Sequence, residues 1–208
     1  MPLYRSFKLE KNKSLYIWEI KESLKDLEKE VTLSSNDEEK LLSIKSAQRK
    51  KEFLASRTLL NFTKLQNTEI KYNIDGAPEL DSKKCISITH CKNFAGIAIG
   101  NNKLGFDLEI YREKIFTIVP KFLNKNEEFI YEFDSIIKGL TLIWTAKEAI
   151  YKAVSAKGIS FKNNIIISPF KSEQKKAFAK VYLNQKEMQF SLNFMIEKKF
   201  CGTIAYID

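Results

Sequence analysis

Apolar and polar residues alternate along several short stretches of the chain, and this pattern predicts β-strands. In residues 105–110, apolar side chains alternate with Asp107 and Glu109, which predicts a strand with one apolar and one acidic face. Further strands are expected at residues 14–20, 85–90, 94–100, 164–167, 177–183, 188–194 and 200–207, with His90 leading into a loop. Asn101-Asn102 is expected to form a hairpin turn that places residues 94–100 and the acidic strand in one sheet.

Helical patterns occupy the regions between these strands. A short helix is expected at Lys21–Lys29, and a long one from Ser35 to about Leu65, because Ser35 and Glu38 have capping-box spacing. Asn126, followed by two glutamates, marks another helix start. The last helix contains residues 144–152 and is expected to end at Lys157-Gly158. Helices and strands do not alternate strictly, so we predict an α+β fold with antiparallel sheets.

Composition narrows the class of protein. The 208 residues predict one compact unit, and an apolar fraction of 44% supplies a core. No stretch approaches the ~20 apolar residues of a membrane span, and the N-terminus lacks a signal sequence, so we expect a cytoplasmic protein without membrane contact. The three cysteines, at positions 85, 91 and 201, have no CxxC spacing, which argues against a disulfide framework or a zinc site.

The net charge of +9 raises the question of nucleic-acid binding. Residues 1–104 contain 19 basic and 14 acidic residues, and residues 105–208 contain 16 and 12, so the excess is spread over the chain. No Arg-rich tail, RNP-like sequence or zinc finger accompanies the charge. It also suits an acidic partner or a polyphosphate ligand. A basic nucleic-acid-binding protein remains an alternative.

Three carboxylates are candidates for a metal site. Asp107 and Glu109 repel each other on one strand face, and Glu148 supplies a third oxygen ligand for a hard ion such as Mg²⁺. Trp144, Glu148 and Lys152 follow at intervals of four residues, so they share one helix face. A solvated surface pair is the commonest meaning of a Glu-Lys spacing of this kind. A metal-dependent phosphohydrolase using Asp107 and Glu109 is a further alternative, although the second ligand cluster of two-metal hydrolases is missing from the sequence.

Basic residues crowd the helical region before residue 65. Most of them are expected on a solvated face, but Arg57 and Thr58 lie where the helix becomes more apolar, so they are stronger candidates for ligand binding. His90 is the only histidine, and no G-x-S-x-G sequence accompanies it, which argues against a Ser-His-Asp hydrolase.

Four short sequences, taken in order, resemble the signatures of the 4′-phosphopantetheinyl transferases, specifically the larger Sfp-type class. Gly76-Ala-Pro78 is similar to the family's Gly-Lys-Pro turn, and Ile88-Thr-His90 to its Ser-His sequence. Residues 105–109 resemble its Gly-Ile-Asp-Ile-Glu strand, and residues 144–152 its Trp-x-x-Lys-Glu-x-x-x-Lys helix. Residues 122–127 are similar to the link Phe-Phe-Ser-x-x-Glu. Ala77 and Thr89 depart from the family's Lys and Ser.

The resemblance implies that the protein is a monomer whose single chain forms a pseudo-dimer. The chain would have two similar α+β halves, each consisting of a sheet with a long helix packed on it. Residues 1–104 would contact the nucleotide of coenzyme A, and residues 105–208 would hold the metal and the catalytic helix. The implied reaction transfers the 4′-phosphopantetheine arm of coenzyme A to a serine of an acidic acyl or peptidyl carrier protein, as in fatty acid biosynthesis, and releases 3′,5′-ADP. It requires Mg²⁺, with Mn²⁺ as a substitute, and no nucleic acid.

The resemblance also assigns roles to residues. It implies that Glu148 and Lys152 are the catalytic residues, and Glu148 is the first candidate for the general base. The metal ligands would be Asp107, Glu109 and Glu148. Coenzyme A would be bound by Lys45, Arg57, Thr58, Gly76, Pro78, Thr89, His90 and Lys152. The basic and apolar residues 115–122 are expected to help dock the carrier protein.

Overall fold

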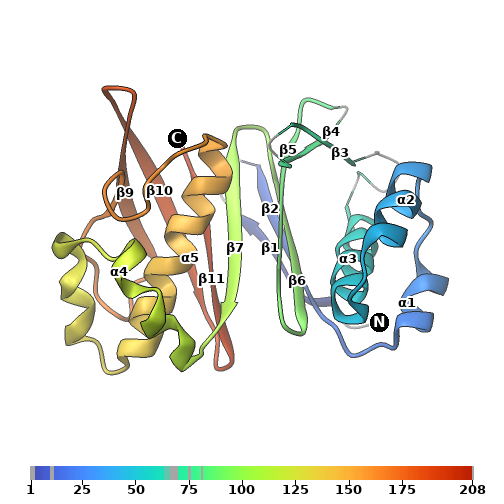
Figure 1. Cartoon of the computed structure of the whole chain (residues 1–208), viewed down its shortest axis with the longest axis horizontal. Helices are drawn as coiled ribbons and strands as arrows, with labels where there is room; N and C mark the ends of the chain where they lie inside the picture. The colour runs from blue at the N-terminus through green and yellow to red at the C-terminus, as the bar shows by residue number, and fades with distance from the viewer. Residues whose placement is uncertain are drawn as a thin grey trace. The chain divides into compact units, whose positions relative to one another are not determined.

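Two antiparallel sheets, each packed against a long helix, form the framework of the protein (Figure 1). The computed structural model describes residues 3–9, 12–63, 65, 70–74, 76–80 and 82–207. The chain divides into two compact units, Met1–Asn101 (the first unit) and Asn102–Asp208 (the second unit). The predicted α+β class with antiparallel sheets is confirmed.

The first unit has a four-stranded sheet in the order β1-β2-β6-β5 and a separate β3-β4 pair. Helix α3 packs on β2, β5 and β6, and its Leu54 and Leu59 lie with Trp18 and Ile97 in a shared core. The elements are β1 (Leu3–Leu9), β2 (Lys13–Glu19), α1 (Leu24–Glu30), α2 (Ser35–Ser43), α3 (Ala47–Leu60), β3 (Ile70–Tyr72), β4 (Pro78–Leu80), β5 (Cys85–Cys91) and β6 (Phe94–Gly100).

The second unit has a five-stranded sheet in the order β7-β11-β10-β9-β8. Helix α5 lies across β7 and β11 and buries an almost continuous apolar surface, including Leu140, Ile143 and Ile150. The elements are β7 (Leu104–Ile110), the 3₁₀ helix η1 (Glu113–Thr117), α4 (Val119–Phe122), the 3₁₀ helix η2 (Lys125–Glu132), α5 (Ile136–Val154), β8 (Ile165–Ile167), β9 (Lys176–Leu183), β10 (Lys186–Ile196) and β11 (Phe200–Tyr206).

The two units share a topology. In each, a strand (β2 or β7) is followed by a long helix (α3 or α5), and the unit ends with a hairpin (β5-β6 or β10-β11). The last strand of that hairpin inserts between its own partner and the strand that preceded the helix. This common order is compatible with two similar halves, as the sequence resemblance implied.

Two helix boundaries differ from the prediction. The long helix expected from Ser35 is two helices, because Ser34 caps α2 and Ser46 caps a new helix by accepting from the Arg49 amide. The predicted end near Leu65 is also wrong, since α3 ends at Leu60; Lys64, within the predicted helix, lies outside the described residues.

The last predicted helix ends earlier than expected. Ser155, rather than Gly158, takes the left-handed conformation (φ 51°) after α5, and its amide donates to the Tyr151 carbonyl. Gly158 also has a positive φ, but it lies in the turn that follows.

The predicted hairpin at Asn101-Asn102 is wrong. Strand β6 is paired with β2 on one edge and with β5 on the other, so neither edge is left for β7, which pairs with β11 in the other sheet. His90 lies within β5 rather than in a loop after it, opposite Ala95 of β6. The acidic strand and His90 therefore belong to different sheets.

Candidate functional site

The candidate site lies where α5 packs on the acidic face of β7. Gly105 makes this packing possible: a Cβ atom at this position would lie 1.8 Å from the Ala149 carbonyl oxygen. Only glycine allows so close an approach of helix and strand. Residues 105, 107 and 109 share this strand face, so Asp107 and Glu109 are brought up against α5.

Lys152 links the helix to the strand. Its ammonium lies 2.7 Å from Asp107 Oδ1 and donates to the Phe106 carbonyl oxygen at 3.0 Å. The Lys152 side chain is 28% exposed, whereas that of Asp107 is only 9% exposed. The ion pair is therefore open to solvent on its lysine side, where an anionic ligand could compete for the ammonium.

Glu109 lies further along β7, near Arg112 and Trp144. The Arg112 guanidinium lies 3.1 Å from its Oε2, and the Trp144 side chain lines the same pocket. Burial and the neighbouring Asp107 carboxylate raise the pKa of Glu109 above its usual value, although Arg112 and Trp144 act to lower it. The two neighbours thus offset only part of the effect of burial and of the Asp107 charge.

Glu148 is the most perturbed acid of the site. Burial, followed by repulsion from Asp107 and then from Glu109, raises its pKa to about 7, although Lys152 opposes the shift. The side chain is half-buried on the Trp144–Lys152 face of α5. A carboxyl group with a pKa near neutrality can accept or donate a proton.

The chemistry of the donors suits a divalent cation. Asp107 and Glu109 both raise the pKa of Glu148, so a positive ion among the three oxygen donors would relieve their repulsion. Within the described ranges, no group of three or more His, Cys, Asp or Glu side chains is already arranged as a metal site. Lys152 and Arg112 instead occupy the carboxylates of Asp107 and Glu109.

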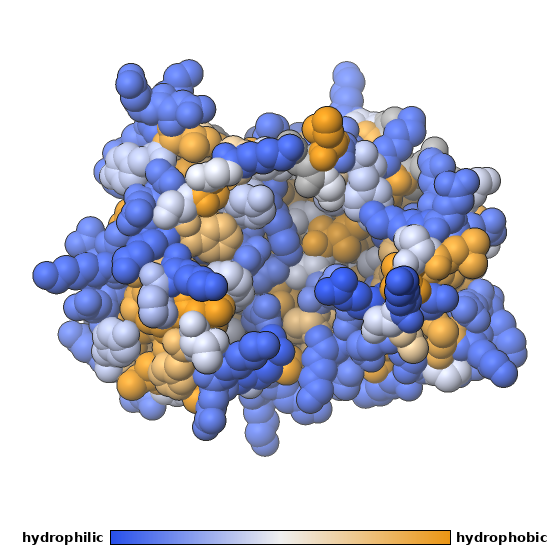
Figure 2. Space-filling view, viewed as in Figure 1, coloured by the Kyte–Doolittle hydropathy of each residue, from blue (hydrophilic) through white to orange (hydrophobic). Residues whose placement is uncertain are grey.

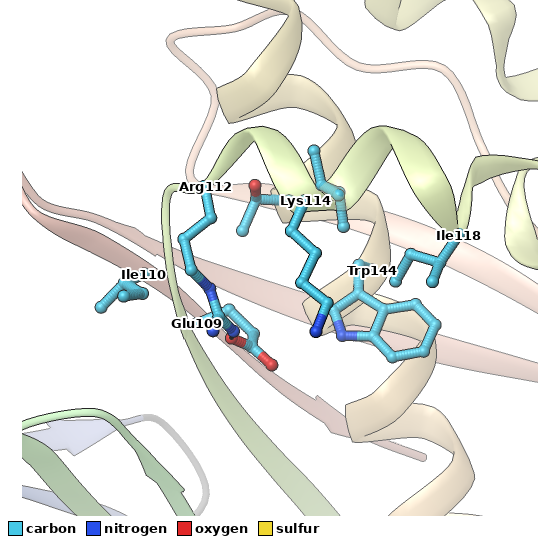
Figure 3. A pocket seen from close by; sticks show the side chains of 8 residues that line it. Glu109, Ile110, Arg112, Lys114, Ile118 and Trp144 are labelled. Atoms are coloured by element: carbon cyan, nitrogen blue, oxygen red, sulfur yellow. Dashed lines mark hydrogen bonds and ion pairs between the residues drawn. The ribbon is translucent and has the colours of Figure 1, made fainter.

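A pocket of about 160 Å³ opens beside Glu109 (Figure 3). Arg112 and Lys114 extend their charged ends toward Glu109 and the Trp144 indole. The remaining lining is largely apolar and consists of Ile110, Ile115, Ile118 and Thr141. An apolar slot with two cations at its rim suits an amphipathic, negatively charged group.

A buried ion pair next to Glu148 was not identified from the sequence. The Lys147 ammonium lies 2.7 Å from Glu127 Oε2, and both side chains are 0% exposed. Burial lowers the pKa of Lys147 to about 8, against the attraction of Glu127. Burial also raises the pKa of Glu127, against its contacts with Lys147 and two backbone amides. The available sequence signal for this pair was that Glu127 and Lys147 both lie in stretches that resemble motifs of the family, residues 122–127 and 144–152.

Arg57 and Thr58 are buried within the first unit. The Arg57 guanidinium contacts Asp37, with an NH2–Oδ1 distance of 2.6 Å, and also donates to Tyr72 Oη and Ser56 Oγ. The Thr58 hydroxyl donates to the Leu54 carbonyl oxygen at 3.1 Å. These donors are thus engaged inside the unit.

His90 is exposed and is oriented by a buried acid. Its Nδ1 lies 3.0 Å from Oε2 of Glu52 on α3. Burial alone would raise the pKa of Glu52, but hydrogen bonds from His90 and Gln48 lower it overall. The carboxylate therefore stays charged and holds the imidazole, whose opposite edge is left toward solvent. Thr89, its neighbour, is buried.

The other residues predicted to bind coenzyme A lie in loops and turns of the first unit. Lys45 is exposed in the break between α2 and α3. Gly76 closes the β3-β4 turn, where its amide donates to the Asn73 carbonyl oxygen and its φ of +80° favours glycine. Pro78 begins β4. The structure thus brings Asp107, Glu109, Glu148 and Lys152 together in one unit, and Glu52 to His90 in the other.

Two comparisons with known proteins bear on this site. Residues 103–201 match the family model described as the 4′-phosphopantetheinyl transferase superfamily. The match spans the acidic strand and α5, and it supports a transferase of this kind. A search of curated proteins gave no match.

The surface and the helices add two observations. In Figure 2, hydrophilic side chains are spread over the visible face of both units, and apolar ones form small patches. Among the described residues, no helix is long and apolar enough to cross a membrane.

Proposed function

We propose that this protein is an Sfp-type 4′-phosphopantetheinyl transferase, which moves the phosphopantetheine arm of coenzyme A to a serine of an acyl or peptidyl carrier protein. The observation that carries the proposal is the cluster of Asp107, Glu109, Glu148 and Lys152 between β7 and α5. The family match over residues 103–201 supports the same reaction class.

The reaction breaks a phosphoanhydride bond and forms a phosphoester bond. The serine oxygen forms a bond to the β-phosphorus of coenzyme A, the bond between that phosphorus and the diphosphate bridge oxygen breaks, and 3′,5′-ADP leaves with the electron pair. The serine loses its proton as it attacks. Catalysis therefore has to lower repulsion at the phosphorus, accept the proton and stabilise the leaving phosphate.

The residues of the second unit are suited to these tasks. Asp107, Glu109 and Glu148 would hold Mg²⁺, which when bound supplies a Lewis acid toward the diphosphate. Glu148, which lies on the same face of α5 as Lys152, is the candidate acceptor for the serine proton, directly or through a water molecule. Lys152 can exchange its ion pair with Asp107 for a phosphate oxygen, and its positive charge then offsets the charge of the leaving group.

We assign binding of the nucleotide part of coenzyme A to residues of the first unit. Lys45 and His90 are exposed, so they are the stronger candidates for direct phosphate contact. Arg57 and Thr58 have donors engaged within the unit, and they would support the site by fixing α3. Thr89 and the Gly76–Pro78 turn complete the assignment that the family resemblance suggests.

We assign docking of the carrier protein to the basic and apolar surface near residues 115–122. Arg112 and Lys114 line the pocket beside Glu109 and are exposed, so they would attract an acidic helical partner. This attraction makes the encounter faster at low salt. The protein would act as a monomer in the cytoplasm.

Intact-mass analysis of an apo carrier protein tests the proposal. The carrier is incubated with this protein, coenzyme A and Mg²⁺, with Mn²⁺ and EDTA in parallel samples. We expect a metal-dependent mass gain of one phosphopantetheine arm, lost when the carrier serine is replaced by alanine. No gain with either acyl or peptidyl carriers would overturn the proposal. Release of phosphate from coenzyme A without a carrier would indicate a phosphohydrolase instead.

A further inference from the structure

The buried pair Lys147–Glu127 is placed one residue from Glu148, yet neither side chain reaches solvent. The Lys147 ammonium also donates to three backbone carbonyl oxygens, each at 2.8 Å: those of Phe122, Phe161 and Ile165. Glu127 in turn accepts from the amides of Asn124 and Ile167, both at 2.8 Å. One ion pair thus ties α5 to three segments distant in sequence.

Two of these segments, at Phe122 and Phe161, pack on Trp144, which lines the pocket beside Glu109; we call this aromatic group the Trp144 wall. The Phe122 and Phe161 rings pack on Trp144, with centroids 5.3 Å and 5.4 Å away, and Phe161 also contacts Tyr151. Trp144 lines one pocket with Glu109 and acts to lower the pKa of that carboxyl. A displacement of either backbone segment would therefore be transmitted through Trp144 to a carboxylate of the site.

Stability alone does not explain a pair of this kind. Two fully buried charges must both lose their hydration, and well-packed apolar residues of similar volume often stabilise a protein as well or better. An apolar side chain could fill the volume of Lys147, but it could not hold three carbonyl groups at fixed distances. The pair fixes backbone positions, which packing alone specifies less sharply.

We propose that Lys147 and Glu127 are positioning residues that fix Glu148 and the Trp144 wall in the geometry the transfer reaction needs. They contact neither substrate nor cation. The inference rests on the proposed function for its catalytic consequence, but its structural part concerns Trp144 and is measurable without any reaction.

The test separates positioning from stability with a double replacement. Lys147→Met alone leaves the Glu127 charge buried without a counter-charge, and we expect it to lower the Tm by roughly 10 °C. Glu127→Gln with Lys147→Met removes both charges, and we expect most of the Tm to return. The matched control is Lys180→Met with Glu187→Gln, which removes a surface pair of 2.8 Å on β9 and β10.

Three measurements are made on each protein in a Trp18→Phe background, where Trp144 is the only indole. They are acrylamide quenching of Trp144, Mn²⁺ affinity by electron paramagnetic resonance, and kcat/KM for transfer. In the stable double variant we expect at least twofold stronger quenching, weaker Mn²⁺ binding and a transfer rate roughly 10–100-fold lower. The surface control should match the parent protein in all three.

A double variant with parental Tm, quenching, Mn²⁺ affinity and transfer would overturn the inference and leave the pair as a fold element. Failure of the parent protein to transfer or to bind Mn²⁺ would overturn the proposed function instead. Acrylamide quenching of Trp144 would then still show whether the Lys147–Glu127 pair holds the Trp144 wall in position. Lys147→Arg, which retains the charge, should recover part of the quenching and transfer lost in Lys147→Met.

Discussion

The two units use one topology but balance their buried charges differently. In the first unit each buried acid near α3 has close hydrogen-bond partners: Asp37 is paired with the Arg57 guanidinium, and Glu52 accepts from His90 and Gln48. In the second unit three carboxylates meet beside α5, and Glu148 keeps a pKa of about 7 despite Lys152. The same scaffold thus surrounds its buried acids with matched partners in one unit and leaves them incompletely compensated in the other.

The units also differ in how closely the helix approaches the strand. Gly105 of β7 allows α5 to pack backbone against backbone, whereas β2, the corresponding strand of the first unit, contains no glycine. The close approach brings carboxylates from two elements into mutual range. Four experiments would break or sharpen this comparison.

The largest effect is expected from Gly105→Ala. Its Cβ would lie 1.8 Å from the Ala149 carbonyl oxygen, so α5 would have to separate from β7. We expect a loss of more than about 4 kcal/mol in the free energy of unfolding, measured by urea denaturation. Gly139→Ala is the control, because its nearest neighbour is a Phe133 side-chain atom at 3.1 Å. Equal stability of the two variants would contradict the close packing.

The next effect is expected on activity. Glu148→Gln removes a metal ligand and the candidate proton acceptor, so we expect kcat/KM for transfer to fall by roughly 10³-fold, about 4 kcal/mol in the activation barrier. The fold should survive, since a repelling charge is removed. The control is Glu173→Gln, an exposed acid of the same unit. Near-normal transfer by Glu148→Gln at saturating Mg²⁺ would refute the assigned role.

A smaller effect is expected from breaking a matched pair of the first unit. Arg57→Met leaves the Asp37 carboxylate buried without its counter-charge, and we expect unfolding to become easier by about 3 kcal/mol. Adding Asp37→Asn should return most of that stability. If Arg57→Met instead left stability unchanged and raised only the KM for coenzyme A, the residue would be a ligand contact rather than a structural one.

The smallest effect is a pH dependence of stability. Glu148 has a pKa of about 7 in the folded state, above its ordinary value of 4.5, so the folded state holds a proton that the unfolded state releases between these values. The charged Glu148 side chain therefore lowers the free energy of unfolding as the pH rises from about 4.5 to about 7. With EDTA present, we expect Glu148→Gln to be more stable than the parent by about 1–3 kcal/mol at pH 8, and this advantage to vanish near pH 4.5. A difference independent of pH would show that Glu148 is not perturbed.

Much of the fold followed from local patterns, and the failures have physical causes. Strand β7 was predicted because apolar residues alternate with Asp107 and Glu109 along it, although it is buried on both faces as far as Leu108, and β9 was predicted from its run of apolar and aromatic residues. Strand β1 was missed because it is an edge strand whose Arg5 and Ser6 are exposed in succession. The break between α2 and α3 was missed because apolar spacing continues across it, while the Ser46 cap acts locally.

Contacts between distant residues were harder to predict. The pairing of β7 with β11 joins residues about 95 positions apart, which no turn signal reveals. The Arg57–Asp37 pair spans a helix break, and the burial of Lys147 depends on partners from three other segments. The grouping of Asp107, Glu109 and Glu148 came from a family resemblance, and periodicity alone would have left Glu148 and Lys152 as a surface pair.

The contact at Gly105 also determines how the site could come apart. The Ala153 amide nitrogen lies 2.8 Å from the position of the missing Cβ and Ala153 is buried against β7, so this amide becomes exposed to water when the helix lifts from the strand. That same opening would separate Glu148 from Asp107. Hydrogen–deuterium exchange at the Ala153 amide would therefore report how often the site opens. The protection factor of this amide would give the fraction of time for which the Glu148 and Asp107 carboxylates are held together.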